Sequence, residues 1–410
     1  MGLFAVLYML PQILAKAFLA GAMDADLAAG RGYDALGRKP RWMAGLARRF
    51  VAFFEAATRP RLRDAAAFLR DDGALRKALQ KDRYGVARWL TEPAVMQPVE
   101  AASSWGLPAL VSVGQLADWL CLGVTELEWL ADLRGTARPG HYHYQTVAKQ
   151  SGASRLLEAP KVRLKAAQRR ILREILDLVP GHGAAHGFRV GRSIRSFVAP
   201  HIGQAVVVRM DLRDFFPSIG RARVQAVFRT LGYPESVADL LGGLCTNKAP
   251  MGGPLYRQPH LPQGAPSSPA LANLCFYRAD CRLAGLAAAA GLPYTRYADD
   301  LAFSGDSVSD ALVARVGAIV QEEGFAVQFR KTRLMRQGVR QHLAGLVVNA
   351  VCNVKREEFD RLKAALHNCA QRGPGEESRD VLAGRVGFVE SVNPGRGRKL
   401  RAILDRIEWK

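Results

Sequence analysis

The chain has 410 residues, of which 49% are apolar, and its 58 Lys and Arg against 37 Asp and Glu give a formal charge of +21. That apolar content can fill the cores of two or three packed units, and it excludes an extensively disordered chain. No glycine or heptad repeat is present, which excludes collagen-like and coiled-coil fibres. So strong a positive charge indicates a polyanionic partner, either a nucleic acid or an acidic membrane surface.

The beginning of the chain is apolar from Gly2 to Leu19, but Pro11 and Lys16 interrupt this run. It lacks the basic stretch that opens a signal peptide, and it is too short to span a bilayer. We therefore expect no membrane span and a helix that packs on the protein or on a partner; a helix lying on a membrane surface is the alternative. The six cysteines form no C-x-x-C pair and show no zinc spacing, which predicts buried thiols in a reducing compartment and a cytoplasmic protein.

The first hundred residues are rich in Ala, Leu and Arg, with apolar residues at helical spacing, as at Leu46, Phe50 and Phe53. The segment Val113–Leu133 predicts two helices that are separated near Gly123. Thr125 and Glu128 have the spacing of a capping box at the start of the second helix. Either a small helix-turn-helix unit or a plain helical hairpin fits this pattern.

The composition changes after residue 135. Residues 136–160 carry Gly, Pro, His and Tyr and predict strands joined by turns, and a strongly basic helix follows at Leu164–Leu178. Residues 141–210 hold 12 Lys and Arg against 3 Asp and Glu. This excess of positive charge is typical of a surface that binds phosphates.

From residue 205 the pattern alternates between strands and helices. A short apolar strand is expected at Ala205–Met210, a hairpin around Asp299-Asp300, and further helices over 350–410. The other expected elements are a helix at Ala311–Glu323 and strands at Ala326–Phe329 and His342–Val348.

Three carboxylates carry the chemistry. Asp211 follows the apolar strand, and Asp299 and Asp300 lie at the turn of the hairpin, so a sheet can bring them together. Carboxylates that lie close together repel one another and need cations to stay ionised. Mg²⁺ prefers such oxygen ligands, and two ions can clamp the attacking and leaving oxygens of a phosphoryl transfer. Each aspartate taken singly is as typical of a turn or a cap, so the prediction depends on the ordered set.

That ordered set resembles the palm signature of reverse transcriptases. Asp211-Leu-Arg-Asp-Phe-Phe216 resembles their motif A, Leu261-Pro-Gln-Gly-Ala-Pro-Ser-Ser-Pro269 their motif B, and Tyr297-Ala-Asp-Asp300 their motif C. Gly324–Lys331 is similar to motif D and His342–Val347 to motif E. The similarity covers residues 140–410.

The resemblance implies an α+β right-hand polymerase with fingers, a ferredoxin-like palm, a helical thumb and an N-terminal helical extension. The boundaries that we expect are 1–135 for the N-terminal helical extension, 136–205 for the fingers, 206–348 for the palm with an inserted fingers segment, and 349–410 for the thumb.

Within reverse transcriptases the chain most resembles the bacterial retron enzymes. Their N-A-x-x-H motif corresponds to Phe197-Val-Ala-Pro-His201, where only the histidine matches, and their V-T-G corresponds to Leu343-Ala-Gly345, where only the glycine matches. These departures leave the retron subtype and the RNA specificity open. The resemblance implies a structured non-coding RNA as template and primer, a branched RNA–DNA product that starts from a 2′-hydroxyl, and a role in anti-phage defence with a separate effector protein.

The resemblance also implies roles for individual residues. Asp211, Asp299 and Asp300, with the carbonyl of Leu212, would bind two Mg²⁺ ions, with Mn²⁺ as a substitute, and Lys331 would be a general acid. The dNTP would be bound by Lys149, Arg155, Phe216, Gln263, Gly264 and Ala298, with Phe216 as the steric gate against a 2′-hydroxyl. The nucleic acid would be contacted by Arg163, Lys165, Arg169, Arg170, Arg173 and His201.

Two alternatives stay open at this point. The first is a bacterial defence polymerase that extends DNA without a branched retron RNA, which the weak matches at residues 197–201 and 343–345 motivate. The second is a non-catalytic RNA-binding scaffold, against which the intact Asp211, Asp299, Asp300 and Gln263 argue.

Overall fold

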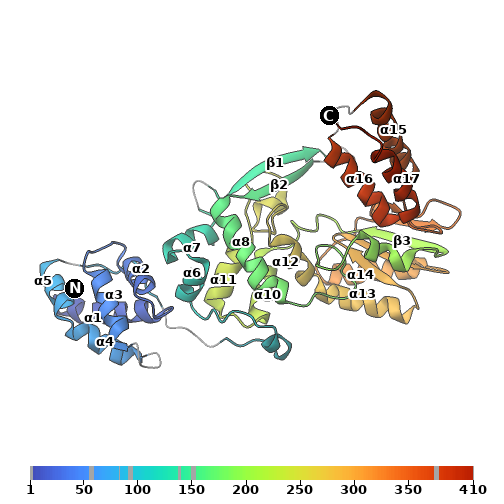
Figure 1. Ribbon diagram of the computed structural model, residues 1–410. Helices are drawn as coiled ribbons and strands as arrows, with labels where there is room; N and C mark the ends of the chain where they lie inside the picture. Colours follow the sequence, from blue (N-terminus) through green and yellow to red (C-terminus); the bar gives the residue numbers. More distant parts are fainter. Residues whose placement is uncertain are drawn as a thin grey trace. The chain divides into compact units, whose positions relative to one another are not determined.

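The computed structural model describes residues 3–54, 60–82, 84–90, 96–136, 140–148, 154–373 and 378–409, with the side chains of residues 3–8 and 372 left aside (Figure 1). The chain forms two compact units. Unit 1 comprises residues 1–180 and 216–271, and unit 2 comprises residues 181–215 and 272–410. The four-segment division predicted from the sequence stays a prediction.

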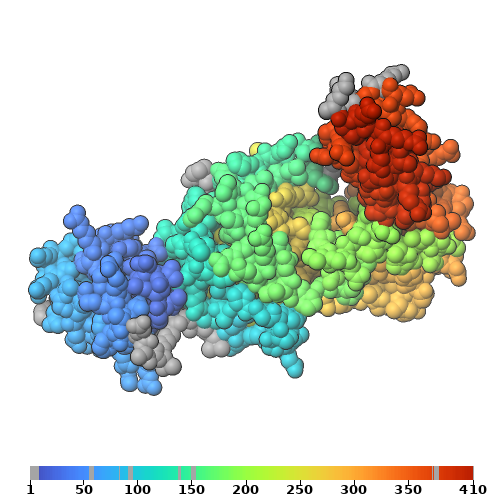
Figure 2. All heavy atoms as spheres, in the orientation of Figure 1, coloured from blue at the N-terminus to red at the C-terminus, as the bar shows by residue number. Residues whose placement is uncertain are grey.

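Unit 1 begins with a bundle of five helices, which appears in blue in Figure 2. These are α1 (Leu3–Leu19), α2 (Ala25–Leu36), α3 (Met43–Phe54), α4 (Leu62–Asp71) and α5 (Gly73–Lys81). Leu14, Phe18 and Phe50 are fully buried in their shared apolar core. The prediction that the first apolar segment packs on the protein is therefore confirmed. Within the described residues, no helix combines the length and the apolar character that crossing a membrane requires.

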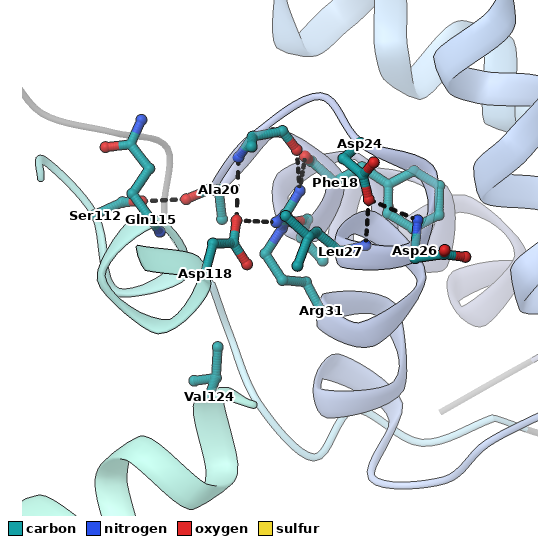
Figure 3. A network of polar contacts seen from close by, with 12 residues as sticks. Phe18, Ala20, Asp24, Asp26, Leu27, Arg31, Ser112, Gln115, Asp118 and Val124 are labelled. Atoms are coloured by element: carbon teal, nitrogen blue, oxygen red, sulfur yellow. Dashed lines mark hydrogen bonds and ion pairs between the residues drawn. The ribbon is translucent and has the colours of Figure 1, made fainter. Parts of the chain in front are cut away.

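A buried arginine joins this bundle to the next pair of helices (Figure 3). Arg31 of α2 is 2% exposed; it donates to the carbonyls of Ala17 and Ala22 and forms an ion pair with Asp118 at 2.5 Å. Burial raises the pKa of Asp118, while the Arg31 guanidinium opposes that shift. The hydroxyl of Ser112 donates to the carbonyl of Ala20 in the same network. These contacts fix α1 and α2 to the segment that begins at residue 112.

The rest of unit 1 consists of a helical pair, a two-stranded ribbon and three further helices. The pair is α6 (Val113–Leu120) and α7 (Val124–Ala131), as the sequence predicted. The remaining elements are the antiparallel β1 (Tyr142–Ala148) and β2 (Ser154–Pro160), the 3-10 helices η1 (Glu100–Ser104), η2 (Leu176–Leu178) and η4 (Pro254–Arg257), and the helices α8 (Val162–Glu174), α10 (Arg221–Thr230) and α11 (Glu235–Leu244).

The predicted cap of α7 is wrong. Gly123 is the N-cap residue and supplies no side-chain bond, while the Thr125 hydroxyl donates to Asp34 of α2 at 2.8 Å. The capping-box spacing was therefore misleading, because the threonine finds its acceptor on another helix.

Unit 2 contains the sheet that carries the carboxylates. Its order is β4 (Tyr294–Tyr297), β5 (Asp300–Gly305), β3 (Val206–Asp211) and β6 (Arg333–Arg336), and all neighbours are antiparallel. The helices α12 (Ser268–Cys275, which begins in unit 1), α13 (Tyr277–Ala289) and α14 (Asp310–Glu322) and the short α9 (Ile194–Val198) and η3 (Ala199–His201) accompany it. The predicted strand at 205–210, the hairpin and the helix at 311–323 are confirmed within a residue or two at each end.

The last part of unit 2 packs three helices on a small second sheet. The helices are α15 (Arg356–Arg372), α16 (Arg379–Val392) and α17 (Pro394–Leu404), and the sheet is formed by β7 (His342–Leu343), β8 (Leu346–Val347) and β9 (Asn353–Val354). Val207, Leu343, Leu366, Leu382 and Leu400 belong to one buried cluster, so these helices share a core with β3 and β7.

Three sequence predictions in this region and among the cysteines are wrong. Residues 326–329 form no strand; they make one isolated bridge to Leu212 and then a 3-10 turn, η5 (Phe329–Lys331). Residues 342–348 form a hairpin rather than one strand, because Ala344 and Gly345 have φ of 44° and 88° and reverse the chain. Cys121 and Cys281 are exposed, although all six cysteines are free thiols.

Candidate active site

The carboxylates meet at one end of the central strand pair. Five of the six residues of β3 are buried, and the strand ends at Asp211, which lies opposite Asp300 in the β3–β5 register. The amide of Leu212 donates to the carbonyl of Asp299 at 2.9 Å. A buried apolar strand followed by an aspartate and a hairpin with two aspartates therefore place three carboxylates beside one another, as the sequence predicted.

The hairpin turn has an unusual backbone conformation. Ala298 has φ of 55°, a left-handed conformation that costs a residue with a Cβ about 1–2 kcal/mol. A Cβ on Gly187 would lie 2.6 Å from the Ala298 amide nitrogen, so only a glycine allows that segment to approach the turn this closely. The surrounding structure must therefore hold the turn in place.

A buried arginine supplies part of that support. Arg296 of β4 and Asp280 of α13 are both fully buried, and the guanidinium binds the carboxylate through Nε at 2.9 Å and Nη2 at 2.6 Å. Its Nη1 donates to the Ala298 carbonyl and to Asn273 Oδ1, each at 3.0 Å. The other end of the Asn273 amide donates to the carbonyl of Gly187. We call Arg296, Asp280 and Asn273 the turn clamp.

The turn clamp was not among the sequence predictions. Two signals could have indicated it: Arg296 stands in a strand that must be buried, and Asp280 is on the apolar face of its helix with Leu283 and Ala287. A charged residue at each of two buried positions predicts an ion pair, because an isolated buried charge is very costly.

Two cations contact the carboxylates. Lys331 Nζ lies 2.8 Å from Asp211 Oδ2, and Arg209 donates to Asp300 Oδ1 from both Nε and Nη2. Burial raises the pKa of Asp300 to about 6; the nearby Asp299 and Asp211 carboxylates act in the same direction, and Arg209 opposes them. The three carboxylates are thus close enough to repel one another.

This donor set fits a hard divalent cation. Carboxylate and carbonyl oxygens suit Mg²⁺, and the mutual repulsion of the aspartates is the condition that a bound cation relieves. Among the described residues, no group of three His, Cys, Asp or Glu side chains forms a metal cage by itself. Mg²⁺ commonly takes only one or two protein carboxylates and completes its shell with water and substrate phosphates, so the arrangement remains suitable.

Two candidate nucleotide-binding residues of unit 1, Gln263 and Gly264, lie against strand β2. The amide of Glu158 in β2 donates to the Gln263 carbonyl at 2.7 Å. Gly264 has φ of 126°, and a Cβ added to it would lie 3.0 Å from the Glu158 carbonyl oxygen. The Glu158 carboxylate is fully buried and binds His260 at 2.9 Å. Gln263 Oε1 is buried and has no hydrogen-bond partner among the described residues, as expected of an atom that a ligand would contact.

The other nucleotide-binding predictions are distributed as follows. Arg155 lies exposed on β2, three residues before Glu158, and Phe216 is half-buried at the start of the second segment of unit 1. Ala298 lies in the turn of unit 2, and Lys149 lies outside the described residues.

The basic helix α8 presents its cations in two directions. Arg163 forms a bidentate pair with Glu126 of α7, and Arg170 lies over the Trp119 ring and pairs with Glu174. Lys165, Arg169 and Arg173 are spaced by four residues and all exposed. We call Lys165, Arg169 and Arg173 the exposed basic stripe.

The predicted contact of His201 with nucleic acid is wrong. Its side chain is fully buried, and its ring nitrogens lie 2.7 Å from the Ser304 hydroxyl and 2.8 Å from the Thr295 hydroxyl. Burial lowers the pKa of His201 to about 4, so the ring is neutral near pH 7. This histidine connects η3 to β4 and β5 and has a structural role.

Comparison with known proteins identifies the class. Residues 147–362, more than half of the chain, match the family model described as reverse transcriptase (RNA-dependent DNA polymerase). The chain belongs to this family and is an RNA-directed DNA polymerase, which sets the scaffold alternative aside and confirms the predicted polymerase fold. Reverse transcriptases generally use divalent metal ions, which agrees with the donor set described above.

Within that family the chain is of the retron type. It is 41% identical to the Retron Mx65 reverse transcriptase of Myxococcus xanthus over 89% of this chain and 81% of that protein. It is 39% identical to Retron Mx162 of the same species (75% and 70%) and 32% identical to Retron Ec86 of Escherichia coli (74% and 92%). The resemblance seen in the motifs is therefore confirmed.

Among solved structures the matches are more distant. A foamy viral protease-reverse transcriptase in complex with double-stranded DNA is 17% identical, with a TM-score of 0.38, and the match covers 66% of this chain and 40% of that one. A telomerase from Candida albicans has a TM-score of 0.36 at 10% identity, over 64% of this chain and 56% of that one.

Proposed function

We propose that this reverse transcriptase copies a dedicated structured non-coding RNA into single-stranded DNA, starting from a 2′-hydroxyl of that RNA, so that the product is a branched RNA–DNA hybrid. The observation that carries the proposal is the meeting of Asp211, Asp299 and Asp300 in a chain 41% identical to a retron enzyme. A role in anti-phage defence with a separate effector protein belongs to the same proposal.

In this proposal the three aspartates and the Leu212 carbonyl hold two Mg²⁺ ions. When bound, the ions would activate the attacking hydroxyl and stabilise the charge that develops on the transferred phosphoryl group. The chain's own residues do the rest. The turn clamp holds Asp299 and Asp300 in position, Lys331 donates a proton to the leaving pyrophosphate, and Arg155 and Lys149 bind the triphosphate.

The selection of nucleotide and template is assigned to other residues. Gln263 contacts the incoming sugar and base, and Gly264 and Ala298 allow a close approach of the backbone. Phe216 excludes a 2′-hydroxyl. The exposed basic stripe binds template phosphates through its three spaced cations.

The test is made on small nucleic acids from cells that express the gene with its native flanking DNA. After removal of protein, samples with and without RNase treatment are run on a denaturing gel that compares wild type with Asp299→Ala/Asp300→Ala. The matched control is Asp306→Ala/Asp310→Ala, which removes two exposed aspartates of the same unit.

We expect one abundant DNA whose mobility changes with RNase and with a debranching enzyme, present in the control and absent in the active-site variant. Aspartate-dependent DNA that is heterogeneous and insensitive to debranching would instead support the alternative without a branched RNA. The absence of any aspartate-dependent DNA would contradict both.

A further inference from the structure

A basic cavity in unit 1 is not used by the proposed reaction. It has a volume of about 520 Å³ and lies between the end of α7, the start of β1, the start of α10 and the loop 246–250. None of the candidate catalytic or dNTP-binding residues that the structure describes lines it. Its size is in the range of sites that hold small molecules, and it exceeds the space that one phosphate requires.

The side chains that line the cavity are predominantly positive. Among the described lining residues, four cations stand against one carboxylate, that of Asp132; the cations are Arg134, Lys161, Arg221 and Lys248. A concave wall of low dielectric focuses such a field and raises the local concentration of anions. The cavity is therefore suited to an anionic ligand.

The hydrogen bonds of Arg221 do not compensate its charge. Its Nε donates to the Thr246 hydroxyl at 3.0 Å and its Nη1 to the Leu133 carbonyl at 2.9 Å, and both partners are neutral. Burial lowers the pKa of Arg221, while Asp132, Tyr142 and Asp239 act in the opposite direction. An anion in the cavity would stabilise this guanidinium.

Polar and aromatic groups accompany the cations. Tyr142, Tyr144 and His141 line the cavity, together with Asn247. The Asn247 amide nitrogen donates to the Tyr144 hydroxyl at 3.2 Å and to Glu158 Oε1 at 2.7 Å. Aromatic side chains and an amide next to cations are the groups that proteins use for unpaired nucleotides, through stacking and hydrogen bonds to base edges.

We propose that this cavity binds a nucleoside phosphate, namely an unpaired nucleotide of the structured RNA, at a site separate from the polymerase centre. The inference rests on the proposed function for the existence of that RNA. A free mononucleotide has the same chemistry and is the other source that the experiment distinguishes.

The experiment uses the full chain and two probes. The first is the RNA transcribed from the DNA that flanks the gene, measured by filter binding over a range of salt concentrations. The second is an equal mixture of AMP, GMP, CMP and UMP, measured by equilibrium dialysis. Neither probe depends on DNA synthesis, so a failed polymerase assay does not affect the outcome.

The test variant is Arg134→Glu/Lys248→Glu, which reverses two exposed cations at the cavity. The matched control is Arg70→Glu/Lys77→Glu, which makes the same charge change at exposed positions of α4 and α5 in the same unit. The thermal midpoint of each variant is measured first, and we expect little change because all four side chains are exposed.

We expect the cavity variant to bind the RNA about tenfold more weakly than the control does at the same salt concentration. The slope of log K against log salt should fall by roughly 1 for each lost phosphate contact. Mononucleotide binding that the cavity variant alone loses, with RNA binding equal in both variants, would assign the cavity to a free nucleotide. Equal loss of RNA affinity in both variants, without mononucleotide binding, would overturn the proposal.

Discussion

Replacing the charged residues of the turn clamp by apolar side chains should distinguish their effect on stability from their effect on kcat. The single variant Arg296→Met leaves the Asp280 carboxylate fully buried without its partner, which costs about 3–5 kcal/mol in the free energy of unfolding. In the double variant Arg296→Met/Asp280→Leu no charge remains buried, and such exchanges are often neutral or stabilising. We expect the double variant to recover most of the thermal stability that the single variant loses.

Activity should not recover with stability. The double variant still lacks the donor to the Ala298 carbonyl, and Ala298 keeps a conformation that costs about 1–2 kcal/mol. A small displacement of reacting groups costs up to about 10²-fold in rate, so we expect kcat to fall by about 10- to 100-fold. The KM for dNTP should change less than kcat, because Ala298 is the one residue assigned to dNTP binding that the clamp contacts in the described part of the chain.

The assay is steady-state extension of a primed RNA template, with the thermal midpoint of each variant measured in parallel. Arg282→Met is the control: this residue is on α13, like Asp280, but its side chain is 36% exposed and pairs with Glu322 and Glu323, away from the turn. It should leave kcat unchanged. A folded double variant with wild-type kcat would refute the reasoning that the clamp positions the aspartates.

Three further predictions concern other residues. Replacing the exposed basic stripe by Glu should weaken template binding and lower the slope of log K against log salt by roughly 1 per residue. The control Arg163→Glu places a second carboxylate beside Glu126 and should mainly lower stability. Equal salt slopes in the two variants would contradict the assignment. Phe216→Ala should lower the preference for dNTP over rNTP in kcat/KM by about tenfold, and unchanged selectivity would exclude it as the gate. The pKa of His201 is about 4 in the folded state and 6.5 in the unfolded chain. The unfolded chain therefore takes up this proton first, and the free energy of unfolding should fall by about 3 kcal/mol as the pH falls from 6.5 to 4. His201→Gln should lack that part of the pH dependence, and an unaltered slope in urea unfolding would show that the buried ring is not its source.

The sequence was sufficient where a local pattern determines the structure. The apolar run before Asp211 and the hairpin around Asp299-Asp300 predicted both strands, and the antiparallel register then brought the carboxylates together. The order of the motifs along the chain was sufficient to predict the family. The same patterns said nothing of the left-handed Ala298, which depends on the close approach of Gly187 and on the hydrogen bond from Arg296.

Two of the failures, those at His201 and Thr125, share a physical cause. His201 matches a motif residue, yet Ser304 and Thr295, which bind its ring, are about a hundred positions away along the chain. Thr125 has capping spacing but donates to Asp34, 91 positions earlier. Polar partners that are distant in sequence decide the role of such residues, and a local pattern does not reveal them.

The Arg31–Asp118 pair has a consequence for any attempt to shorten the protein. A chain that starts after the five-helix bundle would keep Asp118 and Ser112 but lose the guanidinium and the carbonyl that they bind. It would also remove Asp34, which accepts hydrogen bonds from the Val124 amide and the Thr125 hydroxyl at the start of α7. A minimal polymerase made from this sequence therefore requires compensating substitutions at residues 112 and 118, and the bundle is an integral part of the fold rather than a detachable appendage.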